Sequence, residues 1–186
     1  MFNATCQSEL KEFLKDRISL SESTRANYAR GEDTYDPILS QAVAFPESNE
    51  EVSKILKICN KYKIPVVPFG TGTSLEGNVV GNENGITISL EKMNKILSVN
   101  AEDFDCRVQA CVTKEQLNEY LREDGVFFPI DPGANAAIGG MASTSASGTM
   151  AVKYGTMKTA ITGLTVVLPN GDIIRTGSRT KKTSAG

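Results

Sequence analysis

Two long segments of small residues constrain the fold of this chain more than any other feature. Residues 70–85 are rich in glycine and asparagine, and residues 131–155 are rich in glycine, alanine and serine. Neither segment has the periodicity of an amphipathic helix or of a half-buried strand. Loops of this length are uncommon in compact domains unless they serve a function or are disordered. The fold has to be built around them.

Helices are predicted on both sides of the first loop. Amphipathic spacing favours a short helix over residues 8–17, followed by a polar stretch to Pro37. Ser48 and Glu51 form a capping box before a helix that runs to Tyr62. A second capping box, Thr113 with Gln116, opens a helix that Gly125 ends.

Strands are predicted from short apolar runs. They cover residues 64–69, 86–90, 96–100 and 106–111. A hairpin is expected over residues 164–176, with a primed turn at Asn170-Gly171. The predicted fold class is therefore α+β.

Composition and charge exclude several classes of protein. With 40% hydrophobic residues, 23% charged residues and a net charge of −2, the chain resembles an ordinary soluble protein without a basic surface for nucleic acid. No apolar run approaches the roughly 18 residues of a membrane helix, and the amino terminus has no signal-peptide core. We expect a cytoplasmic protein without a transmembrane segment, with peripheral attachment to the inner membrane as the alternative.

Histidine is absent, and the four cysteines form no CxxC pair. The commonest acid–base group and metal ligand is therefore missing, and neither a zinc site nor a disulfide framework is indicated. We expect buried free thiols, no metal site and no catalytic residue within the chain.

The first loop has the composition of an anion-binding nest. It runs from Pro68 to Gly77, and its glycines, hydroxyls and successive N–H groups suit a pyrophosphate without any lysine. A Walker loop is excluded because no Gly-Lys-Ser/Thr ends it. A Rossmann fingerprint needs a helix opening at the glycines, which residues 76–85 do not favour. A tight structural turn remains the alternative.

The second loop offers many backbone amides and small hydroxyls but little charge. Such a segment suits close wrapping of a large ligand such as a flavin nucleotide. A close-packed strand pair or a disordered linker is the alternative, although Ile138 and Met141 argue against a linker. Asp131, which precedes a proline, is expected to fix a turn.

Several motifs, taken in order, resemble the vanillyl-alcohol-oxidase or PCMH type of FAD-binding domain. Residues 66–77 resemble the family's first FAD loop and are most similar to its D-lactate and glycolate dehydrogenase branch. Residues 93–97, 127–133, 138–141, 153–155 and 163–177 continue the resemblance in the same order. The similarity divides the chain into an N-terminal helical segment, 1–36, and a FAD-binding domain, 37–186.

The resemblance implies two α+β subdomains holding FAD between them, without a covalent bond because no histidine is available to anchor it. The first loop would bind the pyrophosphate, the second would wrap the nucleotide, and Tyr154 would help to close the site. The cofactor-binding residues that we expect are Pro68, Gly70, Thr71, Gly72, Thr73, Ser74, Gly77, Asn78, Pro132, Gly133, Ile138, Gly139, Gly140, Met141, Ser143, Thr144, Ser145, Gly148, Tyr154 and Gly155.

The resemblance also implies a reaction. A D-2-hydroxy acid such as D-lactate would be oxidised to its keto acid, and the electrons would pass to a cytochrome or a quinone. The family's FAD domain continues past Gly186, and a histidine-bearing substrate domain follows it. We therefore expect a fragment with an incomplete second subdomain, inactive alone and prone to self-association through unpaired strand edges. A non-catalytic FAD-binding subunit of a glycolate-oxidase-type complex and a degenerate remnant are the alternatives.

A cluster of basic residues lies near the end of the chain. It comprises Arg175, Arg179, Lys181 and Lys182. A solvated face is the simplest interpretation, and an approach to the substrate carboxylate or the FAD phosphates is the alternative.

Overall fold

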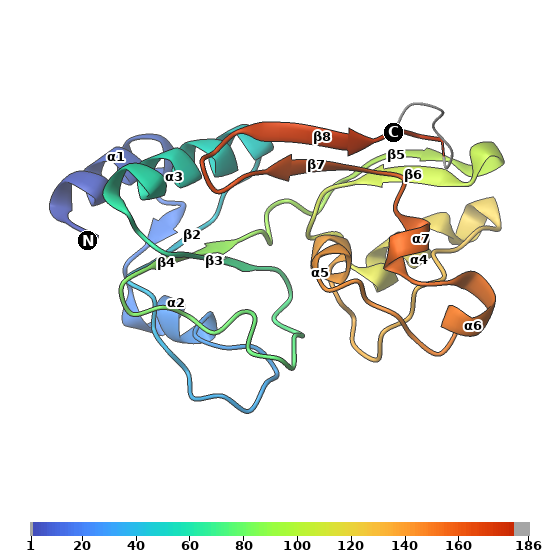
Figure 1. Ribbon diagram of the computed structural model, residues 1–186, viewed down its shortest axis with the longest axis horizontal. Helices are drawn as coiled ribbons and strands as arrows, with labels where there is room; N and C mark the ends of the chain where they lie inside the picture. Colours follow the sequence, from blue (N-terminus) through green and yellow to red (C-terminus); the bar gives the residue numbers. More distant parts are fainter. Residues whose placement is uncertain (1, 181–186) are drawn as a thin grey trace. The chain divides into compact units, whose positions relative to one another are not determined.

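The computed structural model describes residues 2–180 and divides the chain into two compact units (Figure 1). The first unit comprises residues 1–93 and 167–173, and the second comprises residues 94–166 and 174–186. Helices and strands occur in both. The predicted α+β class with two subdomains is confirmed.

A four-stranded sheet forms the centre of the first unit. Its strands are β1 (Ile18–Ser19), β2 (Ala42–Ala44), β3 (Val66–Phe69) and β4 (Ile86–Ser89). Their order is β1-β2-β4-β3, with β2, β4 and β3 parallel and β1 antiparallel to β2. Every residue of β4 is buried, as expected of a central parallel strand covered on both faces.

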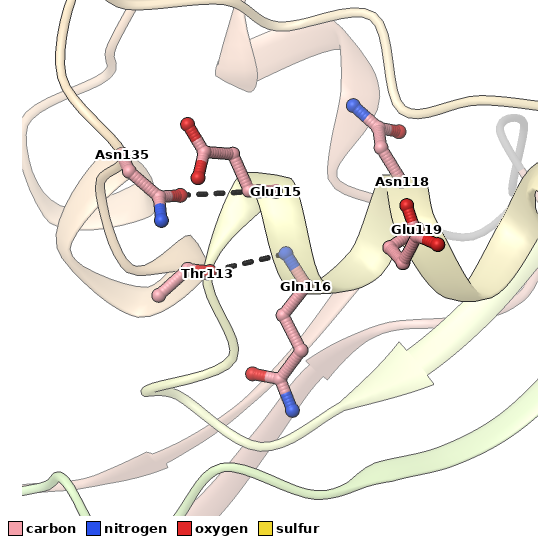
Figure 2. A pocket seen from close by; sticks show the side chains of 6 residues that line it. All are labelled: Thr113, Glu115, Gln116, Asn118, Glu119 and Asn135. Carbon is pink, nitrogen blue, oxygen red and sulfur yellow. Dashed lines mark hydrogen bonds between the residues drawn. The ribbon is translucent and has the colours of Figure 1, made fainter.

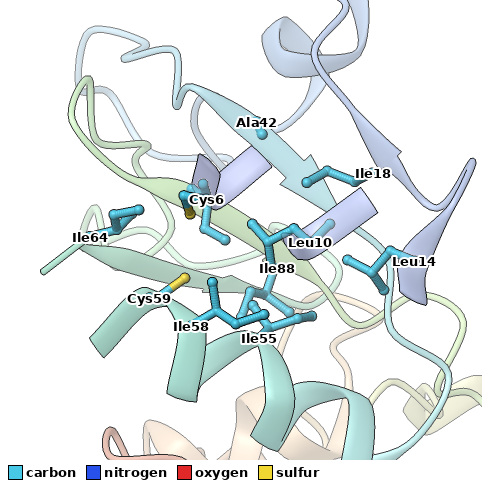
Figure 3. Close-up of a cluster of buried hydrophobic side chains, with 12 residues drawn as sticks. Cys6, Leu10, Leu14, Ile18, Ala42, Ile55, Ile58, Cys59, Ile64 and Ile88 are labelled. Atoms are coloured by element: carbon cyan, nitrogen blue, oxygen red, sulfur yellow. The ribbon is translucent and has the colours of Figure 1, made fainter. Parts of the chain in front are cut away.

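The core of this unit packs two helices against the sheet (Figure 3). The helices are α1 (Ala4–Leu14) and α3 (Asn49–Tyr62), and a short helix, α2 (Glu22–Asn27), follows β1. Fully buried Leu10, Leu14 and Ile55 meet Ile86 and Ile88 of β4. Burying each of these side chains contributes on the order of 2 kcal/mol.

Capping residues decide where these helices begin. Helix α1 begins earlier than predicted because the side chain of Asn3 accepts the N–H of Cys6. At α3 the Ser48 hydroxyl accepts the N–H of Glu51, as the capping box predicts. The Glu51 carboxylate accepts the N–H of Glu47 rather than that of Ser48, so only half of the box forms.

The second unit contains an antiparallel pair and several short helices. The pair is β5 (Ile96–Asn100) with β6 (Asp105–Val108), joined through a 3₁₀ turn, η1 (Ala101–Asp103). Helix α4 (Lys114–Leu121) continues into η2 (Arg122–Asp124), and Gly125 at φ +69° ends it, as predicted. Strand β6 is shorter than predicted because the chain turns at Gln109, whose carbonyl accepts the N–H of Val112.

The small-residue segment 131–155 is not entirely irregular, so that expectation was wrong. It contains α5 (Ile138–Ser143) and α6 (Ala151–Tyr154), and α7 (Met157–Ala160) follows. Met141, Met157 and Ile130 form a small buried cluster with these helices. Local burial of two methionines therefore outweighs the poor helix propensity of the glycines.

The predicted hairpin is present as β7 (Gly163–Val167) and β8 (Ile173–Gly177). Its turn is not of the primed type, because φ is positive at Gly171 (+86°) but not at Asn170. The Leu168 carbonyl accepts the N–H of Gly171, which makes Pro169 and Asn170 the central residues of the turn. Proline fixes a negative φ, which favours a type I turn followed by a glycine bulge.

Three of the four thiols are buried, as predicted. They belong to Cys6, Cys59 and Cys111, whereas Cys106 is exposed on β6 and corrects the expectation. Burial raises the pKa of the Cys59 thiol to about 12. Within residues 2–180, no helix is long and apolar enough to cross a membrane.

Candidate functional site

The first glycine loop is the connection between two parallel neighbours, β3 and β4. It leaves the carboxyl end of β3 and contains no helix or strand from residue 70 to residue 85. Parallel strands require a long crossover, and ligands of α/β sheets bind outside the carboxyl ends of strands. The absence of a helix from residues 70–85 agrees with the argument against a Rossmann fingerprint.

Two glycines of this loop hold conformations that other residues resist. Gly72 has φ +74°, and an added Cβ would lie 2.8 Å from the ring of Phe69. Gly77 has φ +70°, and an added Cβ would lie 2.8 Å from the ring of Tyr35. Both positions combine positive φ with a close aromatic neighbour, so glycine is required at each.

Backbone donors in this loop are left without protein acceptors. Among residues 2–180, the N–H groups of Gly72, Thr73 and Ser74 donate no hydrogen bond to the protein. The Thr71 and Thr73 hydroxyls are 3.3 Å apart, and the Ser74 hydroxyl donates to Asn78 Oδ1 at 2.6 Å. Successive free N–H groups suit an anion with several oxygens, such as a diphosphate.

The second predicted set begins at helix α5. The N–H groups of Ile138 and Gly139 donate to the carbonyls of Val112 and Ala110, each at 2.8 Å. A Cβ on Gly139 would lie 2.8 Å from the Cβ of Ala110, whereas a Cβ on Gly140 would meet nothing within 4 Å. Close packing therefore requires Gly139, while Gly140 is exposed and open to a ligand.

The hydroxyl groups that follow are directed back to their own helix. Ser143 Oγ donates to the Gly139 carbonyl at 2.9 Å, and Thr144 Oγ1 donates to the Gly140 carbonyl at 3.1 Å. Ser145 ends the helix at φ +51°, in the left-handed region. These three residues are exposed, but the hydroxyl hydrogens of Ser143 and Thr144 are already used. Met141 is 1% exposed and belongs to the core.

Asp131, expected to fix a local turn before Pro132, instead ties the start of the second loop to residues 149 and 150. Its carboxylate accepts the Thr149 hydroxyl at 2.7 Å and the N–H of Met150 at 3.1 Å. The bond from Thr149, followed by that from Met150, holds the pKa of Asp131 below its ordinary value. Gly148 fits tightly here, since an added Cβ would lie 2.1 Å from the Asp131 carbonyl oxygen. Gly133, by contrast, is exposed.

The end of the second loop carries an exposed aromatic pair. Tyr154 packs edge-on against Phe127, with ring centroids 5.5 Å apart, and Lys153 Nζ lies 4.9 Å from the Tyr154 centroid. Gly155 has φ +81°, and an added Cβ would lie 2.3 Å from Thr159 Oγ1. The turn therefore requires glycine at position 155. The Tyr154 ring is covered on one side by Phe127 and is otherwise partly exposed.

The two predicted sets lie in different units. Pro68 to Asn78 belong to the first unit, and Pro132 to Gly155 belong to the second. In the basic cluster, Arg179 donates to Asp103 at 2.7 Å and to Asp105 at 2.8 Å, so it forms a structural contact. Arg175 is exposed, as a solvated face requires, and Lys181 and Lys182 lie outside the described residues.

An open depression on the second unit contains none of the predicted residues (Figure 2). Its lining is polar and consists of Thr113, Glu115, Gln116, Asn118, Glu119 and Asn135. Thr113 Oγ1 accepts the N–H of Gln116, and Asn135 Oδ1 accepts the N–H of Glu115. These contacts cap α4, and the Asn135 cap had no local sequence signal because the residue lies far along the chain.

Comparison with known proteins identifies the family. The family described as FAD binding domain matches residues 40–177. The mitochondrial D-lactate dehydrogenase [cytochrome] of Arabidopsis thaliana is 43% identical over 96% of this chain and 32% of its own length. The glycolate oxidase subunit GlcD of Bacillus subtilis is 37% identical over 80% of this chain and 32% of its own length.

A solved structure of alkyldihydroxyacetonephosphate synthase is also similar, with a TM-score of 0.85 and 25% identity over 95% of this chain and 36% of that one. The chain thus spans about a third of the length of the curated relatives it matches. The family match extends over most of the chain and includes both glycine loops. The chain therefore belongs to the FAD binding domain family, and FAD is its cofactor.

Proposed function

We propose that this chain is the FAD-binding portion of a flavin-dependent D-2-hydroxy-acid dehydrogenase, with D-lactate as the substrate and a cytochrome or quinone as the electron acceptor. The similarity to D-lactate dehydrogenase over 96% of the chain supports the substrate class. The name of the same relative, which includes cytochrome, supports the acceptor. A cytoplasmic location stays a prediction, since that relative is named as mitochondrial.

The main support for the proposed cofactor site is a run of backbone donors in the first glycine loop. Among residues 2–180, the N–H groups of Gly72, Thr73 and Ser74 find no protein acceptor, and they follow the carboxyl end of β3. In this proposal they donate to the FAD diphosphate, a role that needs no cationic side chain. The Thr73 hydroxyl, which is 3.3 Å from that of Thr71, adds a polar group to the same loop.

The second loop is proposed to cover the nucleotide. Gly140 offers open space where a ligand can approach the backbone, and Asp131 holds the neighbouring turn through Thr149 and Met150. Tyr154 is proposed to pack beside the cofactor with its exposed ring edge. FAD, when bound, would supply the redox chemistry for the oxidation of the hydroxy acid.

Proton transfer from the substrate hydroxyl is not assigned to these loops. The chain has no histidine, and the Asp131 carboxylate is engaged by two donors that lower its pKa. A useful general base has a pKa near the working pH, which this carboxylate lacks. We therefore propose that the base lies outside this sequence and that the chain alone binds FAD without turnover.

A FAD-binding subunit of a glycolate-oxidase-type complex is the second candidate. The 37% identity to subunit GlcD favours it, because that relative is named as a subunit. The two candidates share the cofactor site and differ in substrate, so the intact protein reduced by D-lactate rather than by glycolate would support the first.

A titration of the 186-residue chain with FAD, followed by flavin fluorescence, tests the cofactor site. The expected result is saturable binding without bleaching by D-lactate. Gly72→Ala places a Cβ 2.8 Å from the Phe69 ring and is expected to weaken binding about tenfold or more, a change of roughly 1.4 kcal/mol. Gly125→Ala is the control, because Gly125 also has positive φ (+69°) but lies at an open position outside both loops. Equal affinity of the two variants would contradict the proposal.

A further inference from the structure

A turn formed by residues 31–35 lies against the first glycine loop within the first unit. The N–H of Glu32 donates to the Gly72 carbonyl at 2.9 Å. An added Cβ on Gly31 would lie 2.4 Å from the same carbonyl oxygen. Tyr35 supplies the ring that lies beneath Gly77. The turn therefore contacts the loop at both of its positive-φ glycines, although it precedes the matched family region, 40–177.

Asp33 holds this turn in shape. The residue is only 6% exposed, and its two carboxylate oxygens accept the N–H groups of Gly31 at 3.1 Å and Tyr35 at 3.0 Å. No ion pair among residues 2–180 includes Asp33. Burying a carboxylate is costly unless donors satisfy it, and here both donors belong to the backbone of the turn. The carboxylate therefore orders the backbone around Glu32.

The Gly72 carbonyl and the Thr73 N–H belong to one peptide unit. No peptide bond among residues 2–180 is cis, so this unit is trans and its C=O and N–H point in opposite directions. Because Glu32 holds the carbonyl, the Thr73 N–H is directed away from the 31–35 turn. That N–H is one of the donors that find no acceptor in the described part of the chain.

We propose that the 31–35 turn is part of the FAD diphosphate site, with Asp33 as a positioning residue. Asp33 orders Glu32, Glu32 holds the Gly72 carbonyl, and the Thr73 N–H is thereby fixed in the orientation that a phosphate oxygen requires. This inference rests on the proposed binding of the diphosphate at residues 70–74. Without the turn, the Gly72–Thr73 peptide would be free to rotate, and part of the binding free energy would be lost in ordering it.

Two substitutions test the inference from opposite sides. Asp33→Ala removes both acceptors, and Gly31→Ala forces a Cβ against the Gly72 carbonyl. Asp33→Asn retains one acceptor oxygen and serves as the conservative variant. Asp36→Ala is the matched control, since Asp36 is an exposed carboxylate of the same segment. Each chain is titrated with FAD and with ADP, which carries the diphosphate but no flavin.

We expect Asp33→Ala and Gly31→Ala to weaken the binding of both ligands about tenfold or more, which corresponds to roughly 1.4 kcal/mol of binding free energy. Asp33→Asn is expected to fall between them and the wild type, and Asp36→Ala to match the wild type. A purely structural role would instead lower the thermal midpoint without changing the affinity of the folded chain. Folded variants that bind FAD and ADP as the wild type does would overturn the inference. If Asp33→Ala does not fold, Asp33→Asn and Gly31→Ala decide the matter.

Amide hydrogen exchange without ligand separates this inference from the proposed function. The Glu32 amide is expected to exchange slowly in the wild type and at least about tenfold faster in Asp33→Asn and Gly31→Ala. A wild type that binds neither FAD nor ADP would count against the proposed diphosphate site. Equal exchange of Glu32 in the wild type and in the variants would refute the positioning role of Asp33, whatever the titrations show.

Discussion

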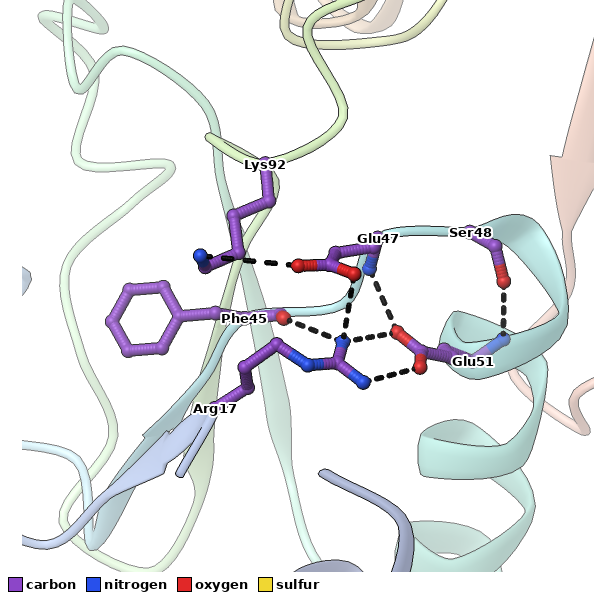
Figure 4. Close-up of polar contacts among 6 residues, drawn as sticks. All are labelled: Arg17, Phe45, Glu47, Ser48, Glu51 and Lys92. Atoms are coloured by element: carbon purple, nitrogen blue, oxygen red, sulfur yellow. Dashed lines mark hydrogen bonds and ion pairs between the residues drawn. The ribbon is translucent and has the colours of Figure 1, made fainter. Parts of the chain in front are cut away.

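Arg17 and Glu51 form a two-bond ion pair within the first unit, although they lie 34 positions apart (Figure 4). The two terminal guanidinium nitrogens, Nη1 and Nη2, donate to the two carboxylate oxygens, and Nη1 also donates to the Phe45 carbonyl at 3.3 Å. The side chains are only 19% and 24% exposed. The pair joins the residue before β1 to the first turn of α3, and a half-buried pair of this geometry stabilises more than an exposed one.

Replacing Arg17 with alanine should destabilise the first unit. The change leaves the Glu51 carboxylate half-buried without its cation, and we expect the free energy of unfolding to fall by about 2 kcal/mol. Urea unfolding measures it. Arg122→Ala is the matched control, because Arg122 pairs with Glu119 at side chains that are 74% and 71% exposed. That control is expected to change stability by less than about 0.5 kcal/mol. Similar losses in both variants would contradict the assignment.

The same pair predicts a loss of stability in acid. Hydrogen bonding to Arg17 is the main cause that holds the pKa of Glu51 below its ordinary value of 4.5. A lowered carboxylate pKa stabilises the folded state above the unfolded pKa, and this contribution disappears as the pH falls through the folded pKa. We expect unfolding free energies measured at about pH 5 and pH 3 to differ more in the wild type than in Arg17→Ala. An identical pH dependence would show that the pair does not shift Glu51.

Thr149 should control the titration of Asp131. Its hydroxyl is the largest cause of the lowered pKa, so Thr149→Val is expected to raise the pKa of Asp131 toward its ordinary value. Carboxyl NMR across the acid range measures this shift. Thr144→Val is the control, because the Thr144 hydroxyl donates to the Gly140 carbonyl instead. The interpretation fails if Thr144→Val moves the pKa of Asp131 as far as Thr149→Val does.

Gly139 and Gly140 should respond to alanine in opposite ways. At Gly139 the new Cβ would lie 2.8 Å from the Ala110 Cβ, and we expect a destabilisation of about 1–3 kcal/mol. At Gly140 the Cβ meets no atom within 4 Å inside helix α5, so alanine is expected to stabilise by about 0.5–1 kcal/mol. Thermal unfolding compares the two. If Gly140 contacts the nucleotide, the stabilised variant should nevertheless bind FAD more weakly; unchanged affinity would remove Gly140 from the proposed site.

Local patterns predicted the parts of the fold that local chemistry determines. The hydroxyls of Ser48 and Thr113 cap the helices that follow them, and strands β3, β4 and β5 lie where short apolar runs placed them. The turn at residues 168–171 was assigned to the wrong type because the Asn-Gly pattern was weighted above Pro169, which fixes a negative φ. The fixed φ of Pro169 thus decides the turn type over the general preference of Asn-Gly pairs for primed turns.

Contacts between distant residues explain what the sequence could not predict. Helix α5 forms because Met141 is buried with Met157 and Ile130, which periodicity within a glycine-rich segment does not reveal. The glycine loops were predicted by composition, but the contact of Gly72 with Glu32 depends on the fold. The segment before residue 37 was therefore assigned to a separate helical region, and its contact with the first glycine loop was not predicted.

An amide NMR titration with FAD tests the central claim most directly. The account predicts saturable shifts at Gly72, Thr73 and Ser74, with Gly140 shifting at the same dissociation constant. Gln116 and Glu119, which line the open depression, should not shift beyond the average. Saturable shifts confined to that depression, with no change at residues 72–74, would contradict the assignment of the first glycine loop to the FAD diphosphate.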